Sequence, residues 1–328
     1  MNFMQTLSIK SLFQFICLSL AAIILSACSS EPQPLLKVGF NQWVGYQPLV
    51  LARELKFYNQ KQIKLAELPS TTDTLQLLHA GELDAAALTL DETLLAIEQG
   101  TPLSVILIFD ISDGADALIA QTNIKTLQEL KGKRIGVEST ATGNIMFYSI
   151  LKQAKLDEKD IHIVYLTADE HVSAYKNNIV DAVITFEPSR TNLLNQGGNE
   201  LFTSRMIPNL IVDVLAVRTD QLQKQHANIQ LLVDGYYKAR HHMKTNAKDA
   251  MQRMALGLGI TPTELQDSFK GLKLPSLTET QALFAGNPSL FEKNAHTVSK
   301  TLQKMGAIDT TLNLTTLQNS AFLDSLQP

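Results

Sequence analysis

The chain has 328 residues, enough for two domains of ordinary size. Hydrophobic residues make up 45% and charged residues 18%, a composition that fills a large core and excludes a mostly disordered chain. The formal net charge of -4 argues against a nucleic-acid binder that works through a general basic field, so no nucleic-acid partner is expected. The two cysteines, Cys17 and Cys28, are too few for a disulfide framework or a four-cysteine zinc site within one chain.

The first thirty residues have the pattern of an export signal. Lys10 is the only charged residue in 1–27, and the apolar run over 12–25 is shorter than the roughly 20 residues that a membrane span needs. The run ends at Leu25-Ser26-Ala27-Cys28, which resembles the lipobox of bacterial lipoproteins. This resemblance implies a cleaved signal peptide over 1–27, a lipid such as palmitate on Cys28, and a polar tether over 28–34. The alternative is a plain signal peptide in which Cys28 is incidental.

Beyond the tether, strand-like runs alternate with helical patterns, which favours parallel sheets covered by helices. The predicted elements in chain order are a strand over 35–40, a loop over 41–47, helices over 48–57 and 73–79, a strand over 85–90, a helix over 91–99, strands over 105–109 and 117–120, a helix ending near 155, and a strand over 209–218. From about residue 221 the chain is mainly helical, over 229–245, 247–256, 263–269, 278–284 and 290–305. We expect this helical part to pack back onto the first half of the fold.

Parts of this order recur at a fixed spacing. Three segments return 97 residues later: Lys37-Val38-Gly39 as Arg134-Ile135-Gly136, Asp84-Ala85 as Asp181-Ala182, and Gln99-Gly100 as Gln196-Gly197. The period is too long for a solenoid repeat and suits two similar α/β lobes. The matches are short, so both a structural duplication and a partly chance coincidence stay open.

Four motifs follow one another over residues 39–188. They are Gly39-Phe40-Asn41-Gln42-Trp43-Val44-Gly45-Tyr46-Gln47-Pro48-Leu49, Gly81-Glu82-Leu83-Asp84-Ala85 ahead of Thr89, Asp110-Ile111-Ser112-Asp113-Gly114-Ala115-Asp116-Ala117, and Phe186-Glu187-Pro188 after a strand. In this order they resemble the substrate-binding proteins of ABC importers of the nitrate, sulfonate and taurine type, which are related to thiamine-pyrimidine-binding proteins. The motifs cover about half of the chain and say less about the ligand than about the family.

The resemblance implies an α/β chain with the two-lobed fold of type II periplasmic binding proteins. Two strands would cross between the lobes, near 114–121 and near 209–217. Lobe 1 would then comprise residues 35–116 and 214–328, including the mainly helical C-terminal part, and lobe 2 residues 117–213.

Candidate binding residues lie on or near the carboxyl ends of strands, where ligands of open α/β sheets bind. They are Gln42, Trp43, Tyr46, Thr89, Asp113, Ser139, Thr140, Thr142, Gly143, Glu187 and Asp213. Trp43, the only tryptophan, stands beside flexible Gly45 and suits stacking or a cation–π contact with a ligand. The segment 139–143 opens a helix with hydroxyls and free N–H groups, which suits an anion.

Each candidate also has a purely structural interpretation. Trp43 could pack on the lobe surface, and Ser139 or Thr140 could be ordinary helix caps. Asp113 could be a turn residue beside a glycine, and Asp213 could lie on a solvated sheet edge.

The charges of these loops indicate the ligand. Asp91, Asp113, Glu187 and Asp213 lie in or near them, and Arg190 is the nearest basic residue. A cationic or hydrogen-bond-donating nitrogen explains these acids better than a plain anion such as nitrate does. In taurine-type binders an acid at the Glu187 motif faces the ligand amine, so the resemblance implies the same here. We therefore expect a small zwitterionic, nitrogenous or sulfonate-like solute, its polar end at 139–143 and its nitrogen near Glu187.

The function expected from this resemblance is solute capture outside the cytoplasm, by a monomer held through the lipid on Cys28 at a bacterial cell envelope, on its periplasmic or extracellular face. Its partners would be an ABC permease and its ATPase. No catalysis, cofactor or metal is expected; the adjacent His241 and His242 point in different directions on a helix. Two alternatives stay open: an enzyme on the same fold, acting on a pyrimidine or related metabolite, and a sensor that presents its ligand to a membrane receptor.

Overall fold

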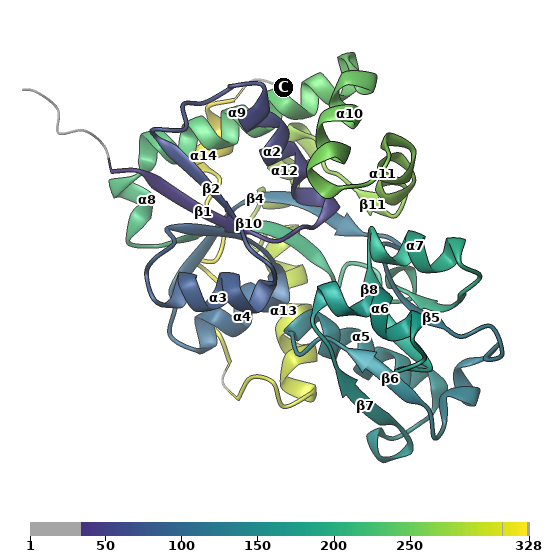
Figure 1. The fold of residues 1–328 in the computed structure, drawn as a ribbon. Coiled ribbons are helices and arrows are strands. Elements are labelled where there is room, and N and C mark those ends of the chain that lie inside the picture. The colour runs from purple at the N-terminus through teal and green to yellow at the C-terminus, as the bar shows by residue number, and fades with distance from the viewer. Residues whose placement is uncertain (1–33, 310, 327–328) are drawn as a thin grey trace, which may run out of the picture. The chain divides into compact units, whose positions relative to one another are not determined.

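Two mixed β-sheets with helices on their faces make up the described part of residues 35–326 in the computed structural model (Figure 1). The structure describes residues 34–309 and 311–326. The predicted signal peptide, the lipidation site Cys28 and most of the predicted tether lie outside the described residues. Within the described part, no helix combines the length and the apolar character that crossing a membrane requires.

The larger sheet has six strands in the order β11-β4-β10-β3-β1-β2. Its strands are β1 (Leu36–Phe40), β2 (Ile63–Glu67), β3 (Ala85–Thr89), β4 (Leu103–Ser112), β10 (Val212–Arg218) and β11 (Leu272–Lys273). β1 runs parallel to β2 and β3, whereas β10 is antiparallel to both β3 and β4. Central β3 is buried along its whole length, as expected for a strand that is covered on both faces.

The smaller sheet has five strands in the order β7-β6-β8-β5-β9. Its strands are β5 (Asp116–Ala120), β6 (Arg134–Val137), β7 (His162–Tyr165), β8 (Ala182–Phe186) and β9 (Asn199–Thr203). β6 runs parallel to β7 and β8, and β5 is antiparallel to β8 and β9.

The 97-residue spacing has a counterpart in the two sheets. In the larger sheet β1 pairs in parallel with β2 and β3, and β10 pairs antiparallel with β3. In the smaller sheet β6 pairs in parallel with β7 and β8, and β5 pairs antiparallel with β8. The pairing Val38–Ala85 in the larger sheet returns as Ile135–Ala182 in the smaller one. An aspartate at the entry of the third strand accepts the backbone N–H of the first strand at 2.8 Å in both, Asp84 from Lys37 and Asp181 from Arg134.

The chain passes between the sheets twice, as predicted. The first passage joins β4 to β5 and the second joins β9 to β10, and they touch where the hydroxyls of Ser112 and Ser204 lie 2.8 Å apart. The predicted lobe boundaries fall slightly inside strands. Asp116 pairs with Phe186 in the smaller sheet, and Asp213 pairs with Thr89 in the larger one. The division into two lobes stays a prediction with its boundaries moved by one or two residues.

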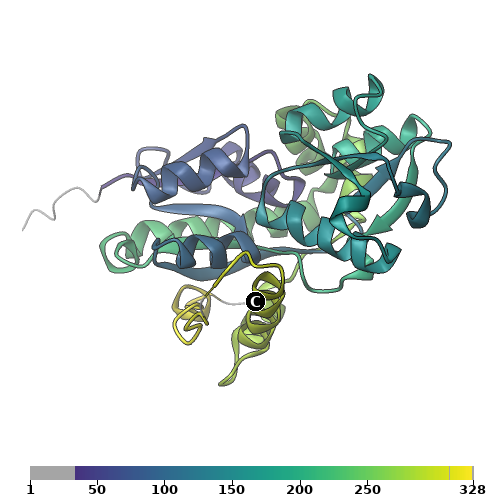
Figure 2. The same ribbon diagram turned by 90° about the horizontal axis from the view of Figure 1, so that it is seen from below.

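Helices cover both faces of the larger sheet (Figures 1 and 2). The helices of the first part are α2 (Gln47–Glu54), α3 (Thr71–His79), α4 (Leu90–Glu98), α5 (Ala141–Ala154), α6 (His171–Lys176) and α7 (Ser189–Asn195). The C-terminal part contributes α8 (Gln221–Lys224), α9 (His226–Thr245), α10 (Ala247–Leu258), α11 (Pro262–Phe269), α12 (Leu277–Phe284), α13 (Leu290–Lys304) and α14 (Ala321–Asp324). Short 3₁₀ turns, including Val44–Tyr46 ahead of α2, connect several elements.

The C-terminal helices pack back onto the larger sheet as expected. Buried side chains from α9 to α14 share one hydrophobic cluster with β1 and β4, and the hydroxyl of Tyr236 reaches the carbonyl of Phe109 at 3.3 Å. The helix predicted over 48–57 ends at Glu54, because Lys56 adopts a left-handed conformation with φ of 57° that stops it.

Candidate functional site

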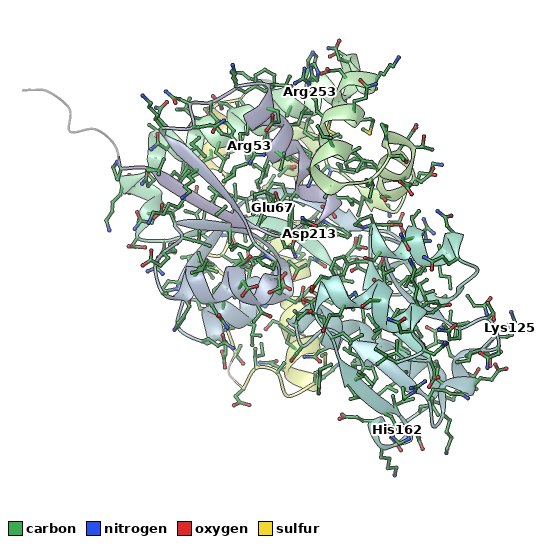
Figure 3. The ribbon with its side chains drawn as sticks, viewed as in Figure 1. Arg53, Glu67, Lys125, His162, Asp213 and Arg253 are labelled. Atoms are coloured by element: carbon green, nitrogen blue, oxygen red, sulfur yellow. The ribbon has the colours of Figure 1, made fainter. Side chains whose placement is uncertain are left out.

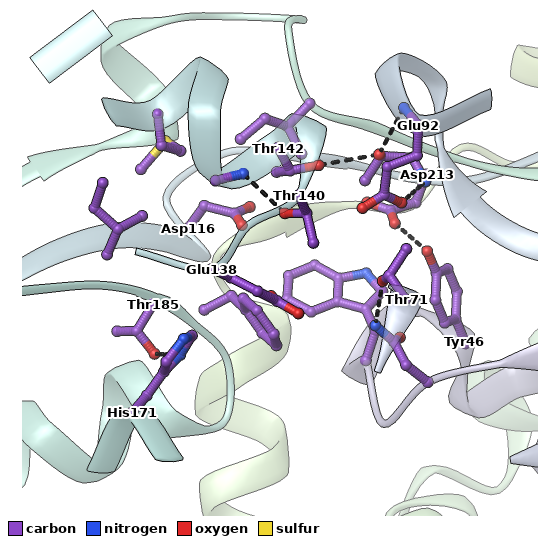
Figure 4. A pocket seen from close by; sticks show the side chains of 18 residues that line it. Tyr46, Thr71, Glu92, Asp116, Glu138, Thr140, Thr142, His171, Thr185 and Asp213 are labelled. Carbon is purple, nitrogen blue, oxygen red and sulfur yellow. Dashed lines mark hydrogen bonds between the residues drawn. The ribbon is translucent and has the colours of Figure 1, made fainter. Parts of the chain in front are cut away.

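A pocket of about 50 Å³ is lined by loops and helix ends from both sheets (Figure 4). The larger sheet and its helices contribute Asn41, Trp43, Tyr46, Thr71, Thr89, Glu92 and Asp213; the smaller sheet and its helices contribute Asp116, Glu138, Thr140, Thr142, Gly143, Met146, His171, Ile184, Thr185 and Phe186, and Ile211 comes from the second passage. Most of these residues lie at or after the carboxyl ends of β1, β3, β6 and β8, where open α/β sheets bind their ligands. In Figure 3, Asp213 lies inside the fold, whereas Lys125 and His162 lie at its outer edge.

Seven of the eleven predicted binding residues line this pocket. They are Trp43, Tyr46, Thr89, Thr140, Thr142, Gly143 and Asp213. The other four, Gln42, Asp113, Ser139 and Glu187, do not line it.

Trp43 lies on the loop between β1 and α2, and its side chain is buried. Its indole N–H donates to Oδ2 of Asp110 at 3.1 Å, and its ring meets Phe186 edge-on with 5.8 Å between centroids. Because Phe186 ends β8, this ring contact joins the two sides of the pocket. Gly45 is needed for close approach rather than for flexibility, since a Cβ there would stand 1.8 Å from Oδ2 of Asp110.

Asp213 lies in the middle of the larger sheet, so its predicted alternative position on a solvated sheet edge is wrong. It pairs with Asp110 across the β4–β10 ladder, and both carboxyls are almost fully buried. The Tyr46 hydroxyl donates to Oδ1 of Asp213, and the Asp213 carboxyl also forms a side-chain hydrogen bond with the Asp110 carboxyl. Burial, and next the neighbouring Asp110, raise the pKa of Asp213 well above its ordinary value. The pair therefore retains a proton at neutral pH.

Glu92 lines the pocket from the first turn of α4. Its carboxylate accepts the Thr89 N–H at 3.0 Å, and the Thr89 hydroxyl accepts the Glu92 N–H at 3.4 Å, which together form a capping box. Burial, and next the charge of Asp91, raise the pKa of Glu92. One acid thus caps the helix and also faces the pocket.

The start of α5 contacts the start of α4 across the pocket. Thr140 caps α5 by accepting the Gly143 N–H at 3.1 Å. Thr142 donates to Oδ2 of Asp91 at 2.9 Å, and its hydroxyl lies 3.0 Å from that of Thr89. The predicted anion site therefore has these hydroxyls already engaged within the protein.

The smaller sheet contributes two further acids. Asp116, the first residue of β5, is buried, and its Oδ2 lacks a hydrogen-bond partner within the described ranges. Glu138 follows β6 and is also largely shielded. Burial raises the pKa of Asp116 to about 7 and that of Glu138 to about 7.

His171 faces these acids as a neutral side chain. It is buried, its Nδ1 lies 3.1 Å from the Thr185 hydroxyl, and its ring meets Phe186 edge-on. Burial lowers the pKa of His171 to about 4, so it brings no positive charge to the pocket at neutral pH.

Glu187 requires a correction, because its carboxylate is completely buried and turned to protein partners. Arg190 donates to Oε1 at 2.8 Å, Thr191 donates its N–H at 3.0 Å and its hydroxyl at 2.9 Å, and Ser268 of α11 donates from 3.3 Å. Arg190 compensates the charge of the acid, and the other donors satisfy its hydrogen-bonding capacity. Glu187 therefore joins the smaller sheet to α11, and it is not among the residues that line the pocket.

The other three predicted residues lie outside the lining of the pocket. Gln42 and Ser139 are exposed next to lining residues, because the chain turns each of them outward. Asp113 forms ion pairs with Arg205 at 3.7 Å and Lys273 at 3.2 Å, so it anchors the first passage.

The main residues that the sequence patterns missed are acids beside predicted ones. Glu92 follows Asp91, and Glu138 precedes Ser139. Asp116 lies within the motif that drew attention to Asp113. The position of these acids near strand ends could have predicted that they line the pocket. The sequence around His171 or Thr71 contains no pattern that predicts a binding residue.

The chemistry of the pocket is acidic. Four carboxyls line it, and no lysine or arginine is among the described lining residues. Within the described ranges, no three or more Asp, Glu, His or Cys side chains gather in a way that could hold a metal ion. The arrangement can accept hydrogen bonds and positive charge, and the aromatic rings of Trp43 and Phe186 are part of its lining.

The model of the NMT1-like family matches residues 29–257 of this chain, more than half of its length. The chain belongs to the NMT1-like family. It is 23% identical over 279 residues to the Escherichia coli (strain K12) protein named "Putative aliphatic sulfonates-binding protein", which covers 82% of this chain and 86% of that protein. It is 26% identical over 152 residues to the taurine-binding periplasmic protein of the same strain, covering 45% of this chain and 47% of that one. These relatives are binding proteins.

Solved structures share the fold. The alkanesulfonate-binding protein SsuA from Xanthomonas axonopodis pv. citri, bound to MOPS, superimposes with a TM-score of 0.73 at 16% identity over 89% of this chain and 100% of that one. The desulfurization enzyme DszB superimposes with a TM-score of 0.66 at 14% identity, over 88% and 98%. The type II periplasmic-binding-protein fold predicted from the sequence is confirmed, and this fold also occurs in an enzyme.

Proposed function

We propose that this protein is the extracytoplasmic solute-binding component of an ABC importer, held at the bacterial envelope as a monomer by lipid on Cys28. It captures a small zwitterionic, nitrogenous or sulfonate-like solute and delivers it to a permease driven by an ATPase. The observation that carries this proposal is the buried pocket to which both sheets contribute polar groups. Family membership and the binding-protein relatives support it.

Capture would work by closure of two lobes about the passages β4–β5 and β9–β10. In the arrangement seen here, the two sides already touch at Thr142–Asp91 and at Ser268–Glu187. We infer that this is a closed form, in which the solute is removed from water and held by a few placed polar groups.

The proposed ligand-binding set follows the pocket rather than the full sequence-based list. It retains Trp43, Tyr46, Thr89, Thr140, Thr142, Gly143 and Asp213 and adds Glu92, Asp116, Glu138 and His171. Desolvation and hydrogen bonding suffice for binding, so the proposal includes no catalytic residue and no cofactor.

A melting-temperature panel tests capture. The protein is heated with taurine, alkanesulfonates, nitrate, aminopyrimidines, amidines and polyamines. A ligand at a hundredfold excess over its dissociation constant stabilises by about 2.7 kcal/mol, which is readily measured. Absence of a shift with every compound would contradict solute capture.

Labelling of cells with a radioactive fatty acid tests the anchor. Wild type should incorporate the label and fractionate with membranes, and the Cys28→Ser variant should do neither. Incorporation that persists in Cys28→Ser would place the lipid on another residue. Absence of label in the wild type would contradict the lipid anchor.

A further inference from the structure

We propose that the pocket selects a small organic cation with N–H groups on more than one nitrogen, of the amidinium or guanidinium class, and that this cation bridges acids from both sheets. The inference rests on the proposed solute-binding function and narrows it. It departs from the sulfonates named for the relatives of this chain.

The distribution of charge is the first support. Glu92 and Asp213 reach the pocket from the side of the larger sheet, and Asp116 and Glu138 from the side of the smaller one (Figure 4). No lysine or arginine is among the described lining residues. Burial keeps these acids partly protonated while the pocket is empty, and a cation between them favours their ionised, hydrogen-bond-accepting forms. A sulfonate would instead place its negative charge beside these acids.

Unpaired acceptors are the second support. Oδ2 of Asp116 and Oδ1 of Asn41 are buried without hydrogen-bond partners in the described part of the chain. Asp116 is 5% exposed. Buried acceptors without donors are costly, so the missing donors are expected from the ligand. Several N–H groups on one cation satisfy acceptors that lie on different elements.

The helix start that could have taken an anion is already used. The Thr140 hydroxyl accepts the Gly143 N–H, and the Thr142 hydroxyl donates to Asp91. Glu138 lies directly before this segment, and its ionised form would repel an incoming anion. A pure cation therefore fits better than a zwitterion whose anionic end needs this helix start.

The shape of the pocket limits the size of the cation. A volume of about 50 Å³ holds only a few waters, so a planar group of a few heavy atoms fits. The aromatic rings of Trp43 and Phe186 line the pocket, and aromatic rings can attract a delocalised cation.

Protonation links binding to pH. When the pocket is empty, burial raises the pKa values of Asp116 and Glu138 to about 7, so protons partly occupy the places that a cation would neutralise. Other titratable or charged groups surround the acids of the pocket. They are Asp91 and Glu92 from α4, Asp110 from β4, Asp213 from β10, Tyr46 before α2, Asp169 and His171 at α6, Glu187 after β8, and Arg240 from α9. A cation must displace these protons, so its affinity should rise with pH.

Calorimetry on the full chain in detergent tests the assignment with probes of similar size. Methylguanidinium and acetamidinium are compared with neutral methylurea, and with methanesulfonate and taurine, at pH 6 and pH 8. We expect heat from the cations, at least tenfold tighter binding at pH 8, and proton release measured in buffers of different ionisation enthalpy. Asp213→Asn and Glu138→Gln should each weaken cation binding at least tenfold, as loss of a hydrogen bond to a charged group predicts. Asp157→Asn, at a carboxyl whose side chain is 76% exposed, is the matched control.

The outcomes separate this inference from the proposed function. Binding of methanesulfonate or taurine without cation binding would overturn the cation assignment and leave solute capture standing. Cation binding that is equally tight at both pH values and releases no protons would overturn the bridging of these carboxyls. Silence from every probe would count against both. The proton-release measurement needs only the wild-type protein, so a variant that fails to fold leaves the test intact.

Discussion

Replacement of Asp116 by asparagine should stabilise the unliganded protein at pH 8 and leave its stability nearly unchanged at pH 4. Asp116 is buried at the start of β5, and Oδ2 of its carboxyl has no partner among the described residues. Asparagine has almost the same shape and never ionises. The substitution therefore removes the cost of a buried charge and little else.

The size of the effect follows from the pKa. Burial raises the pKa of Asp116 from its ordinary value of 3.8 to about 7. The protonated carboxyl contributes stability that is fully present below pH 4 and is lost as the pH rises through 7, because the unfolded chain ionises first. A rise of this size corresponds to at most about 4 kcal/mol, and relaxation of the surroundings reduces it. We expect the stability difference between Asp116→Asn and wild type to grow by about 2–4 kcal/mol between pH 4 and pH 8.

Urea unfolding of the fragment 29–328, which contains the whole compact unit 35–328, measures this difference at both pH values. Other titrating groups cancel in the comparison of variant with wild type. A variant that is destabilised equally at pH 4 and pH 8 would refute the reasoning, because Asp116 would then act through packing or hydrogen bonding instead of charge.

Three further predictions concern single side chains. Trp43 is the only tryptophan, so ligand binding should change the intrinsic fluorescence. Asp110→Asn should shift the emission of the unliganded protein, because Asp110 accepts the indole N–H. An unchanged spectrum at saturating ligand would place the ligand away from the indole. Glu187→Gln should lower stability by about 2 kcal/mol in urea unfolding and change probe affinity less than about threefold, whereas lost affinity with intact stability would restore Glu187 to the binding set. Gly45→Ala should destabilise by about 1–3 kcal/mol because its Cβ collides with the Asp110 carboxyl. The helical control Gly257→Ala, whose Cβ meets nothing closer than 3.9 Å, should stabilise by up to about 1 kcal/mol, and equal effects at the two sites would contradict the contact.

The sequence by itself determined the fold class and most central elements. Buried strands such as 85–89 are continuous apolar runs, and helix starts carry local signals such as Thr89 with Glu92 three residues later. Residues spaced 97 positions apart occupy equivalent pairings in the two sheets, Val38–Ala85 and Ile135–Ala182. Edge strands β2, β7 and β9 were not predicted, because short half-exposed strands lack a strong apolar run.

Only the tertiary structure decided which acids face the pocket. Asp213 and Glu187 look alike in sequence, each an acid at or after an apolar run. Asp213 lines the pocket, whereas Glu187 forms an ion pair with Arg190, accepts a hydrogen bond from Ser268 and does not line the pocket. Ser268 lies 81 residues away from Glu187, on a different part of the fold. Local sequence patterns predict which segments are buried and where strands and helices begin and end. The partner that satisfies a buried charge comes from a distant segment, and that partner determines whether the acid remains free to bind a ligand.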